Sequence, residues 1–441
     1  MKLLSKQAES IIGSLYDSGY EAYAVGGCTR DMIMGRESQD TDITTSATPQ
    51  EIKKVFRSLH TIDTGIRHGT VTVLMDGIPF EITTYRTEKG YSDGRHPDKV
   101  TFTRSLTEDL KRRDFTVNSI AYSPRDGFVD PFGGREDIER GLLRCVGNPK
   151  ERFTEDSLRI LRGLRFCSVL GFSIEKNTAE AMRECKELLS IVSKERIFSE
   201  LTKLICGKNV RDVLVSYSDI LEVVLPEIKG MKGFDQHNFH HIYDVLEHTA
   251  AVTESIPPVP HLRYAALFHD CGKPDCFSTD ENGVGHFYSH PSVSAKKAEE
   301  ALLRLKSDTK TREAVIKLVK THDTPIEESE RIIKKRLRSM GEELFFDLIR
   351  LKRADTKGLA PEFHDREIHF DKLEKMAKEI IKNEECFSLR DLKINGNDLI
   401  REGFIGKEIG SALSAALEAV IDGRVKNEKE ALLSFCSGNR Q

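Results

Sequence analysis

The chain has 441 residues, which is more than one hydrophobic core usually serves, so its length predicts two to four packed units. Its formal net charge of -4 excludes a strongly basic overall field, and any nucleic-acid surface must be a local patch. Nine cysteines in no tight pair, with no secretory signal at Met1, predict reduced thiols and a cytoplasmic protein. No apolar run approaches the roughly 20 residues that a membrane span needs, so we expect no membrane partner; the oligomeric state stays open.

The sequence pattern changes character once along the chain. Up to about residue 145, a helical pattern around residues 8–15 is followed by strand patterns at 22–25, 41–43, 70–75 and 79–84. From about residue 150, helical periodicity with few strand signals continues to the end. We therefore predict an α+β protein, with domain boundaries near residues 146, 212 and 388.

Two carboxylates, Asp40 and Asp42, follow the glycine-rich segment 25–31. Alternate residues of a strand point the same way, so this pair could share one or two hard divalent cations. Paired metals suit phosphoryl transfer, because one activates the attacking hydroxyl and the other neutralises the leaving pyrophosphate. The glycines would let the backbone approach a triphosphate, and Arg30 adds a charged donor. The pattern predicts a nucleotidyl-transfer site.

Two further motifs are rich in charge. The segment 109–118 places Arg112 and Arg113 in a polar turn, for which a solvated charge run is the alternative interpretation. The second motif begins at residue 155 and continues as a stripe at every third position, which on an ideal helix winds by about 60° per step. The stripe consists of Asp156, Arg159, Arg162 and Arg165. Its alternative interpretation is an ordinary salt-bridged helix face.

The four motifs, in this order, resemble those of class II tRNA nucleotidyltransferases, the family of CCA-adding enzymes and bacterial poly(A) polymerases. The resemblance implies a DNA polymerase β-like nucleotidyltransferase head followed by an all-α neck, body and tail. The expected domains are a catalytic head (1–145), a base-recognition neck (146–211), a helical body with an HD-type domain (212–387) and a tRNA-binding tail (388–441). The implied reaction adds or repairs the 3′-terminal CCA of tRNA from CTP and ATP, with Mg²⁺ and without a nucleic-acid template.

The resemblance also implies roles for individual residues. Asp40 and Asp42 would be catalytic and hold Mg²⁺, with Glu81 as a third carboxylate or, equally, a structural residue. The implied nucleotide-binding residues are Gly27, Arg30, Arg113, Asp156, Arg159, Arg162 and Arg165. Asp109 and Asp114 would fix the surroundings of Arg113 by charge-assisted bonds, and Gly26 is a further candidate beside the triphosphate.

Base selection can be explained by hydrogen-bond chemistry. The bases C and A share an exocyclic amino donor beside a ring-nitrogen acceptor, whereas U and G reverse that order. An Asp acceptor with an Arg donor could therefore select C and A, and the family assigns this role to Asp156 and Arg159. The glycine-rich segment 85–98 has the composition of a mobile loop. In the family such a loop is linked to the switch from C to A addition, which argues against a CC-only enzyme.

A second constellation of histidines and aspartates lies in the helical half, and its order resembles the HD-domain phosphohydrolases. The resemblance implies a divalent transition metal held by His248, His269, Asp270 and Asp355. His290 and His322 would bind a second metal or a substrate phosphate. Other candidates for the first histidine are His237, His240 and His241. A catalytically silent set of residues is the alternative.

Three functions thus remain open. The first is CCA addition, with the HD-type domain as an additional phosphohydrolase. The second is an A-adding tRNA nucleotidyltransferase or poly(A) polymerase with the same head. The third is an HD-type phosphohydrolase or RNA-binding module with a vestigial head, which the intact Asp40 and Asp42 disfavour. A basic run at residues 331–338 predicts either a phosphate-binding track or a solvated helix face.

Overall fold

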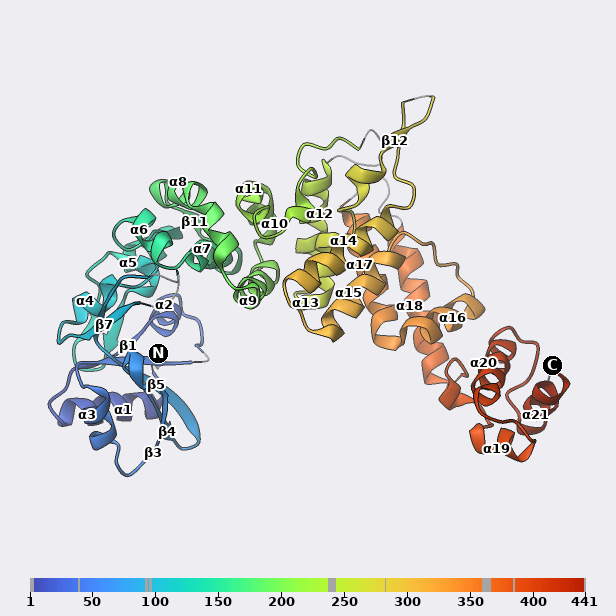
Figure 1. The fold of residues 1–441 in the computed structure, drawn as a ribbon, viewed down its shortest axis with the longest axis horizontal. Helices are drawn as coiled ribbons and strands as arrows, with labels where there is room; N and C mark the ends of the chain where they lie inside the picture. Colours follow the sequence, from blue (N-terminus) through green and yellow to red (C-terminus); the bar gives the residue numbers. More distant parts are fainter. Residues whose placement is uncertain are drawn as a thin grey trace. The chain divides into compact units, whose positions relative to one another are not determined.

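The computed structural model describes residues 4–38, 40–91, 94, 97–236, 243–281, 283–358, 366–383 and 385–439. It divides into two compact units, residues 1–226 and 227–441, which are described separately (Figure 1). The finer boundaries expected from the sequence stay predictions. Within the described residues, no helix is long and apolar enough to cross a membrane. All nine cysteines are free thiols.

The first unit is organised around one mixed sheet of seven strands in the order β3-β4-β5-β2-β1-β8-β9. Its parallel pair is β2 with β5, and the other neighbours are antiparallel. The strands are β1 (Ala22–Val25), β2 (Asp42–Thr45), β3 (His60–Gly65), β4 (Thr70–Met75), β5 (Ile78–Thr84), β8 (Ala121–Ser123) and β9 (Gly127–Val129). The predicted strands at 22–25 and 70–75 are confirmed.

The two faces of this sheet carry different cores. Helices α1 (Lys6–Asp17) and α3 (Pro49–Val55) share a core with Ala24 of β1. The next residue, Val25, belongs to a second core that includes Leu110 of α4 (Leu106–Lys111). Because residues paired across antiparallel strands point to the same face, Asp42, the partner of Val25, points to the α4 face.

The rest of the first unit is mostly helical. Its remaining helices are α2 (Gly27–Ile33), α5 (Gly134–Arg140), α6 (Pro149–Glu155), α7 (Leu158–Leu170), α8 (Lys176–Glu184), α9 (Lys194–Ile205), α10 (Val210–Ser216) and α11 (Ser218–Leu221). Two short strand pairs complete it: β6 (Arg86–Lys89) with β7 (Lys99–Phe102), and β10 (Leu142–Leu143) with β11 (Ser173–Ile174). Helix α9 packs on α7 through an apolar face that buries Ile197, Leu201 and Leu204.

The second unit is helical apart from the pair β12 (Ser278–Thr279) and β13 (Gly285–His286). Its helices are α12 (Val245–Ser255), α13 (Pro260–Phe268), α14 (His290–Arg304), α15 (Thr309–Thr321), α16 (Glu330–Met340), α17 (Glu342–Lys357), α18 (Arg366–Lys382), α19 (Gly396–Arg401), α20 (Lys407–Ile421) and α21 (Lys429–Gly438). Helix α13 is almost wholly buried and packs against α12, α14, α15 and α17, so it belongs to the core that these helices form. The last helices, α19 to α21, lie apart from this group within the unit (Figure 1).

The basic run at residues 331–338 lies on α16 and has acidic partners. Asp422, which follows α20, forms ion pairs with Arg331 at 2.6 Å and with Lys335 at 2.9 Å. Lys334 pairs with Glu385 at 2.5 Å. These ion pairs therefore join α16 to the last helices of the unit. Neither sequence interpretation, a phosphate-binding track or a solvated helix face, fully describes these basic residues.

Candidate functional site

Strand β1 ends at a glycine turn that gathers several of the predicted residues. Gly26 has φ +80°, a backbone conformation that favours glycine, and it precedes the first residue of α2. A Cβ atom on Gly26 would lie 3.4 Å from Arg113 Nη1 and 3.6 Å from Asp42 Oδ2. The turn, the carboxylate and the guanidinium thus meet around one point.

The two aspartates do not both lie on a strand, and this part of the sequence interpretation was wrong. Strand β2 begins at Asp42, while Asp40 lies in the preceding segment, where its carbonyl accepts a bond from Ser38. The reason is that Val25, the partner of Asp42, is the last residue of β1, so no strand partner remains for Asp40. Partial burial raises the pKa of Asp42; Arg113 opposes this effect and the charge of Asp40 adds to it.

Glu81 lies on the neighbouring strand β5. The parallel register pairs Ile43 with Ile82. Asp42 and Glu81, the residues just before this pair, therefore occupy corresponding positions on the two strands. Ile43 and Ile82 both point into the core beneath α1 and α3, and the residues before them therefore face the opposite side together. The structure thus brings Glu81 to the same face as Asp42.

Arginines surround the glycine turn. One cavity of the first unit is lined by Gly26, Gly27, Arg30, Asp42, Arg113, Asp114, Arg162 and Arg165. Arg30 is buried and donates to Asn118 Oδ1 at 2.9 Å and to Asp31 Oδ1 at 2.8 Å. Three of the guanidinium groups, those of Arg30, Arg162 and Arg165, lie over the ring of Phe166. The cavity is therefore rich in preorganised cationic donors.

Two buried aspartates hold the arginines in place. Asp114 accepts both Nε and Nη2 of Arg162, at 2.9 and 2.7 Å, and the backbone N–H of Phe115 at 2.8 Å. Burial would raise the pKa of Asp114, but Arg162 outweighs it and lowers that pKa. Asp109 accepts from Thr44 of β2 and from Arg112, and lies 3.6 Å from Arg113. Both carboxylates therefore orient arginine side chains, and their supporting role at a nucleotide site stays a prediction.

Arg113 itself is partly buried and incompletely paired. Its Nε atom has no hydrogen-bond partner among the described residues, and its nearest described carboxylate is Asp109. Burial lowers the pKa of Arg113, although Asp109 and Asp42 oppose that effect. A partly buried guanidinium with spare donors beside an open cavity is suited to receiving an anion.

Asp156 does not lie on the helix of the arginine stripe, so the predicted continuous spiral was wrong. Asp156 follows the end of α6 with extended backbone, φ -142°, and α7 begins only at Leu158. Its Oδ1 accepts the backbone N–H of Leu158 at 3.1 Å, which turns the chain into α7. Its Oδ2 accepts Arg196 Nη2 of α9 at 2.8 Å.

Arg159 is anchored separately from Asp156. It donates to Glu155 Oε2 at 2.7 Å and to the carbonyl oxygen of Arg112 at 3.2 Å. Asp156, Arg159, Arg196 and Glu81 nevertheless line one cavity. The structure therefore brings the side chains of Asp156 and Arg159 to the same cavity, and the bond between the two residues runs through the backbone, from the Arg159 N–H to the Asp156 carbonyl at 3.0 Å.

The segment expected to be a mobile loop contains regular structure. Its first part is β6, which pairs with β7. Glu88 of β6 forms an ion pair with Arg112 at 3.1 Å and accepts a hydrogen bond from the Tyr91 hydroxyl at 2.6 Å. The cross-strand bonds explain why a turn-rich composition did not produce an open loop over residues 86–89. Ser92, Asp93, Arg95 and His96 lie outside the described residues.

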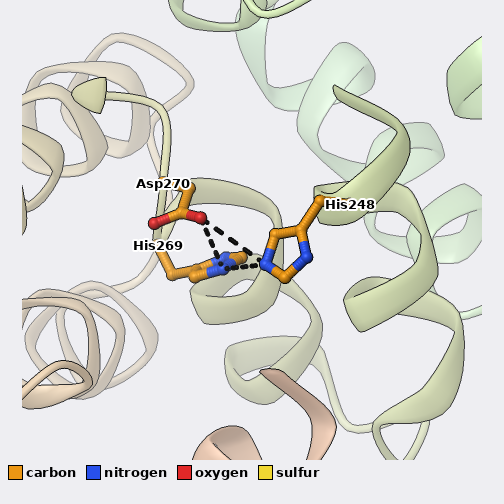
Figure 2. Close-up of side chains that lie close together, drawn as sticks. All are labelled: His248, His269 and Asp270. Carbon is orange, nitrogen blue, oxygen red and sulfur yellow. Dashed lines mark hydrogen bonds and ion pairs between the residues drawn. The ribbon is translucent and has the colours of Figure 1, made fainter. Parts of the chain in front are cut away.

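The second unit contains a compact cluster of imidazoles and carboxylates. His248 of α12 lies 3.3 Å from His269, measured between their Nε2 atoms, and Asp270 Oδ2 lies within 3.5 Å of both rings (Figure 2). Asp355 of α17 is 3.0 Å from His248 Nε2. His248, His269 and Asp270 meet the geometry of a metal-binding triad.

The other oxygen of Asp270 takes part in a second triad. Asp270 Oδ1 lies 3.3 Å from His290 Nε2 and 3.7 Å from His322 Nε2, and these two nitrogens are 3.3 Å apart. This group also has the spacing of a metal site. One carboxylate thus joins two triads, which is the arrangement of a bridging ligand between two cations. His237, His240 and His241 lie outside the described residues.

The orientation of the imidazoles supports metal binding. All of them place Nδ1 near a backbone carbonyl: His248 on Gly358, His269 on Ala266, His290 on Phe287 and His322 on Val319. A ring that donates its Nδ1 proton directs the Nε2 lone pair toward the centre. Several lone pairs directed at one point repel one another unless a cation lies between them. The residues therefore fit a divalent metal.

The pKa values of two cluster histidines shift in opposite directions. Burial disfavours a charged His269, but Asp270 and Asp355 outweigh that effect and raise its pKa to about 10. Burial lowers the pKa of His322, which favours the neutral form that binds metals. The buried carboxylates of the cluster therefore favour a positive charge beside them, which either a proton or a metal ion can supply.

Three family models match different parts of the chain. Residues 22–144 match the poly A polymerase head domain, and residues 171–231 match the probable RNA and SrmB-binding site of polymerase A. Residues 277–436 match the model described as putative domain 2 of tRNA nucleotidyltransferases. A CCA-adding enzyme of Lactobacillus delbrueckii subsp. bulgaricus is 35% identical over 441 residues, which cover 97% of this chain and 96% of that protein. The chain belongs to the CCA-adding enzyme family.

Other comparisons agree with this assignment. A CCA-adding enzyme of Streptococcus agalactiae is 34% identical and covers 98% of this chain and 96% of its own length. The crystal structure of the Bacillus stearothermophilus CCA-adding enzyme in complex with CTP superposes with a TM-score of 0.76 at 31% identity, over 98% of this chain and 96% of that one. A Thermotoga maritima CCA-adding enzyme complexed with tRNA shares the fold, with a TM-score of 0.59 at 21% identity. The predicted α+β fold class is confirmed.

Sequence reasoning missed several charged residues that the fold brings to the two cavities of the first unit and to the histidine cluster. Arg196, Glu200 and Lys203 lie on one face of α9 and reach Asp156, Arg165 and the cavity at the glycine turn, respectively. Lys273, which contacts Asp270 at 2.7 Å, was also missed. No local motif marks the α9 residues, because their partners are some 35 to 40 positions away in sequence.

Proposed function

We propose that this chain builds or repairs the 3′-terminal CCA of tRNA in the cytoplasm, transferring nucleotides from CTP and ATP in the cavity at the glycine turn. The observation that carries the proposal is that the side chains of Asp42 and Arg113 converge on Gly26, where an added Cβ would lie 3.6 and 3.4 Å from them, inside a cavity lined by further arginines. Carboxylates on one side and guanidinium groups on the other match a metal-bound triphosphate.

Asp40 and Asp42 would hold Mg²⁺, with Glu81 as a third oxygen donor. Oxygen ligands suit a hard cation, and Asp42 and Glu81 face the same side of the sheet. When bound, Mg²⁺ supplies activation of the terminal tRNA hydroxyl and charge neutralisation at the leaving pyrophosphate. Partial burial and the charge of Asp40 raise the pKa of Asp42, and a cation bound between the two carboxylates would lower it.

The triphosphate would lie between the glycine turn and α7. Gly26 and Gly27 keep side-chain bulk away from the cavity, so backbone N–H groups of the start of α2 can approach phosphate oxygens. Arg30, Arg113, Arg162 and Arg165 would add charged donors. Asp109 and Asp114 fix the guanidinium groups of Arg113 and Arg162, which reduces the ordering that binding requires.

Base choice is assigned to Asp156 and Arg159. An ionised Asp156 only accepts hydrogen bonds and Arg159 only donates them, so together they match the amino donor and ring acceptor of C and A. U and G would present a carbonyl oxygen to the Asp156 carboxylate, which is unfavourable because both groups are acceptors. No nucleic-acid template is needed for this selection.

The test uses three transcripts of one tRNA, ending before CCA, after C and after CC. Each is incubated with CTP and ATP, singly and together, and the products are sequenced. Conversion of all three to CCA-ended tRNA is the expected result. Extension of the CC-ended transcript alone would instead establish A-only addition, and long A tails would establish a poly(A) polymerase.

A second candidate function is supported by the cluster in the second unit. Two metal triads bridged by Asp270 offer the Lewis acids and metal-bound water that hydrolyse phosphate esters. We propose a metal-dependent phosphohydrolase activity at His248, His269, Asp270, Asp355, His290 and His322, with a divalent transition metal suited to imidazole ligands. Assay of the metal-loaded chain on phosphomonoesters and on cyclic nucleotides tests it. A loaded but inactive cluster would establish a structural metal site.

A further inference from the structure

Helix α9 presents a polar stripe beside the nucleotide cavities. Arg196, Glu200 and Lys203 are spaced i, i+4 and i+7, so they share one face, while Ile197 and Leu204 are buried in the core. Glu200 is buried and contacts Arg165 of α7 at 3.2 Å. The stripe thus supports α7 and the turn before it with charged contacts.

The strongest contact of this stripe is made to the base-reading carboxylate. Arg196 Nη2 donates to Asp156 Oδ2 at 2.8 Å, and the Leu158 N–H donates to Asp156 Oδ1 at 3.1 Å. In the described part of the chain these are the hydrogen bonds that the Asp156 side chain receives. Each oxygen keeps a free lone pair, so the carboxylate can still accept the amino group of a base.

The other arginine near Asp156 is Arg159, and its guanidinium already has hydrogen-bond partners. The Arg159 guanidinium is held by Glu155 and by the Arg112 carbonyl. Within the described residues its only hydrogen bond to Asp156 is from its backbone N–H to the Asp156 carbonyl, at 3.0 Å, which leaves the Asp156 carboxylate to other donors. Arg196 is therefore the described side chain that anchors the carboxylate. Both Arg196 and Asp156 are partly exposed, at 23% and 18%, and both line the cavity that contains Arg159. An ion pair at such a position contributes little to stability, so its value lies in orientation.

We propose that Arg196 is a positioning residue for base selection, which holds the Asp156 carboxylate as a fixed acceptor facing the incoming base. The inference rests on the proposed base-reading role of Asp156. A fixed carboxylate meets the carbonyl of U or G as an unpaired acceptor and rejects it. A carboxylate held only by the Leu158 N–H can rotate away, and water can then satisfy the wrong base. Arg196 would therefore act on discrimination more than on turnover.

The experiment measures kcat/KM for CTP and UTP on a transcript ending before CCA, and for ATP and GTP on a transcript ending in CC. The variants are Arg196→Met, Arg196→Lys, Asp156→Ala and the double variant. Arg140→Met is the matched control, because Arg140 is an exposed arginine that pairs with Glu136 on α5, away from both cavities. Thermal unfolding checks each fold, and Arg196→Gln replaces the Met variant if that variant is unfolded.

Arg196→Met is expected to lower the CTP/UTP and ATP/GTP ratios by about tenfold or more, with a smaller change in kcat for the correct nucleotides. Arg196→Lys should recover most of the discrimination, since one N–H donor makes the contact. The double variant should discriminate no worse than Asp156→Ala. Arg140→Met should match the unmodified chain.

Two results separate the failure of this inference from that of the proposed function. If Asp156→Ala loses discrimination while Arg196→Met keeps it, the positioning role is overturned and the base-reading role stands. If Asp156→Ala keeps discrimination, the base-reading role itself fails. Equal loss of kcat for all four nucleotides in Arg196→Met, with unchanged ratios, would identify a purely structural ion pair and also overturn the inference.

Discussion

The two candidate metal sites of this chain differ in how complete they are. In the first unit Asp40 and Asp42 are exposed, Asp40 precedes the strand, and the groups around them are arginines that cannot bind a metal. In the second unit His248, His269 and Asp270 are fully or almost fully buried, and their ligand atoms already converge.

This difference teaches how each site acquires its metal. Mg²⁺ prefers several oxygen ligands and keeps waters, so two or three carboxylates with phosphates from a substrate form a site that is complete only when nucleotide is bound. The buried imidazole cluster supplies its ligands from the protein alone and should retain a metal without substrate. The first arrangement suits a cation that arrives with each nucleotide, and the second suits a resident cation.

The largest expected effect tests the proposed metal site at Asp40 and Asp42 in the first unit. Asp42→Ala should lower nucleotide incorporation by a factor on the order of 10³ or more, because the proposed metal loses its strand-borne ligand. Binding of tRNA, measured by filter retention, should remain nearly unchanged. Glu139→Ala, an exposed carboxylate on α5, is the matched control. Substantial residual turnover in Asp42→Ala would show that the metal lies elsewhere.

The next largest effect tests the buried cluster of histidines and aspartates in the second unit. Asp270→Ala removes the carboxylate shared by both triads, so metal content after dialysis, measured by mass spectrometry, should fall from about two ions per chain to none. CCA addition should persist, because the two sites lie in different units. Asp275→Ala, which removes an exposed carboxylate paired with Lys297, should keep the metal. Loss of both the metal and CCA addition would show that the two units are functionally coupled.

A smaller effect is expected where the first unit relies on supporting residues. Asp114→Asn removes the charge that fixes Arg162, so kcat/KM should fall by about 10- to 100-fold for CTP and ATP alike. The preference for C and A should not change, because Asp156 and its contacts are untouched. A change in base preference would contradict the separation between phosphate-binding and base-reading residues.

The smallest effect concerns stability and pH. The folded state raises the pKa of Asp42, so the folded chain binds this proton more tightly than the unfolded chain does. At neutral pH, without Mg²⁺, the ionised carboxylate is therefore a small cost, because Asp42 is exposed, and Asp42→Asn should raise Tm by no more than about 1 °C. The difference should shrink as the pH falls through the pKa of Asp42. Added Mg²⁺ with CTP should raise Tm of the unmodified chain only. A lower Tm for Asp42→Asn without Mg²⁺ would contradict this sign.

Local chemistry determined much of the first unit. The strand pattern at 22–25 placed the turn at Gly26, and this spacing was enough to locate the carboxylate at Asp42. Helical periodicity after residue 150 predicted the change to an all-helical region. These features follow from side-chain alternation and turn chemistry, which act over a few residues.

The two wrong element boundaries in the sequence interpretation also have structural explanations. The strand at Asp42 was extended back to Asp40 because the sequence does not reveal that its partner strand stops at Val25. The charge stripe was continued through Asp156 because a three-residue period does not reveal that one helix ends at Glu155 and the next begins at Leu158. In each case a pairing partner or a capping bond elsewhere in the fold set the boundary.

The sequence by itself determined which residue types are present for phosphate and metal chemistry, and its motifs named most residues of both sites. Only the tertiary structure decided that Arg196 of α9 reaches Asp156, and that one carboxylate, Asp270, bridges imidazoles from four helix ends. Those contacts join positions up to about fifty residues apart. Sequence spacing constrains only neighbours on the same helix or strand, whereas packing of buried apolar faces brings distant charged groups together.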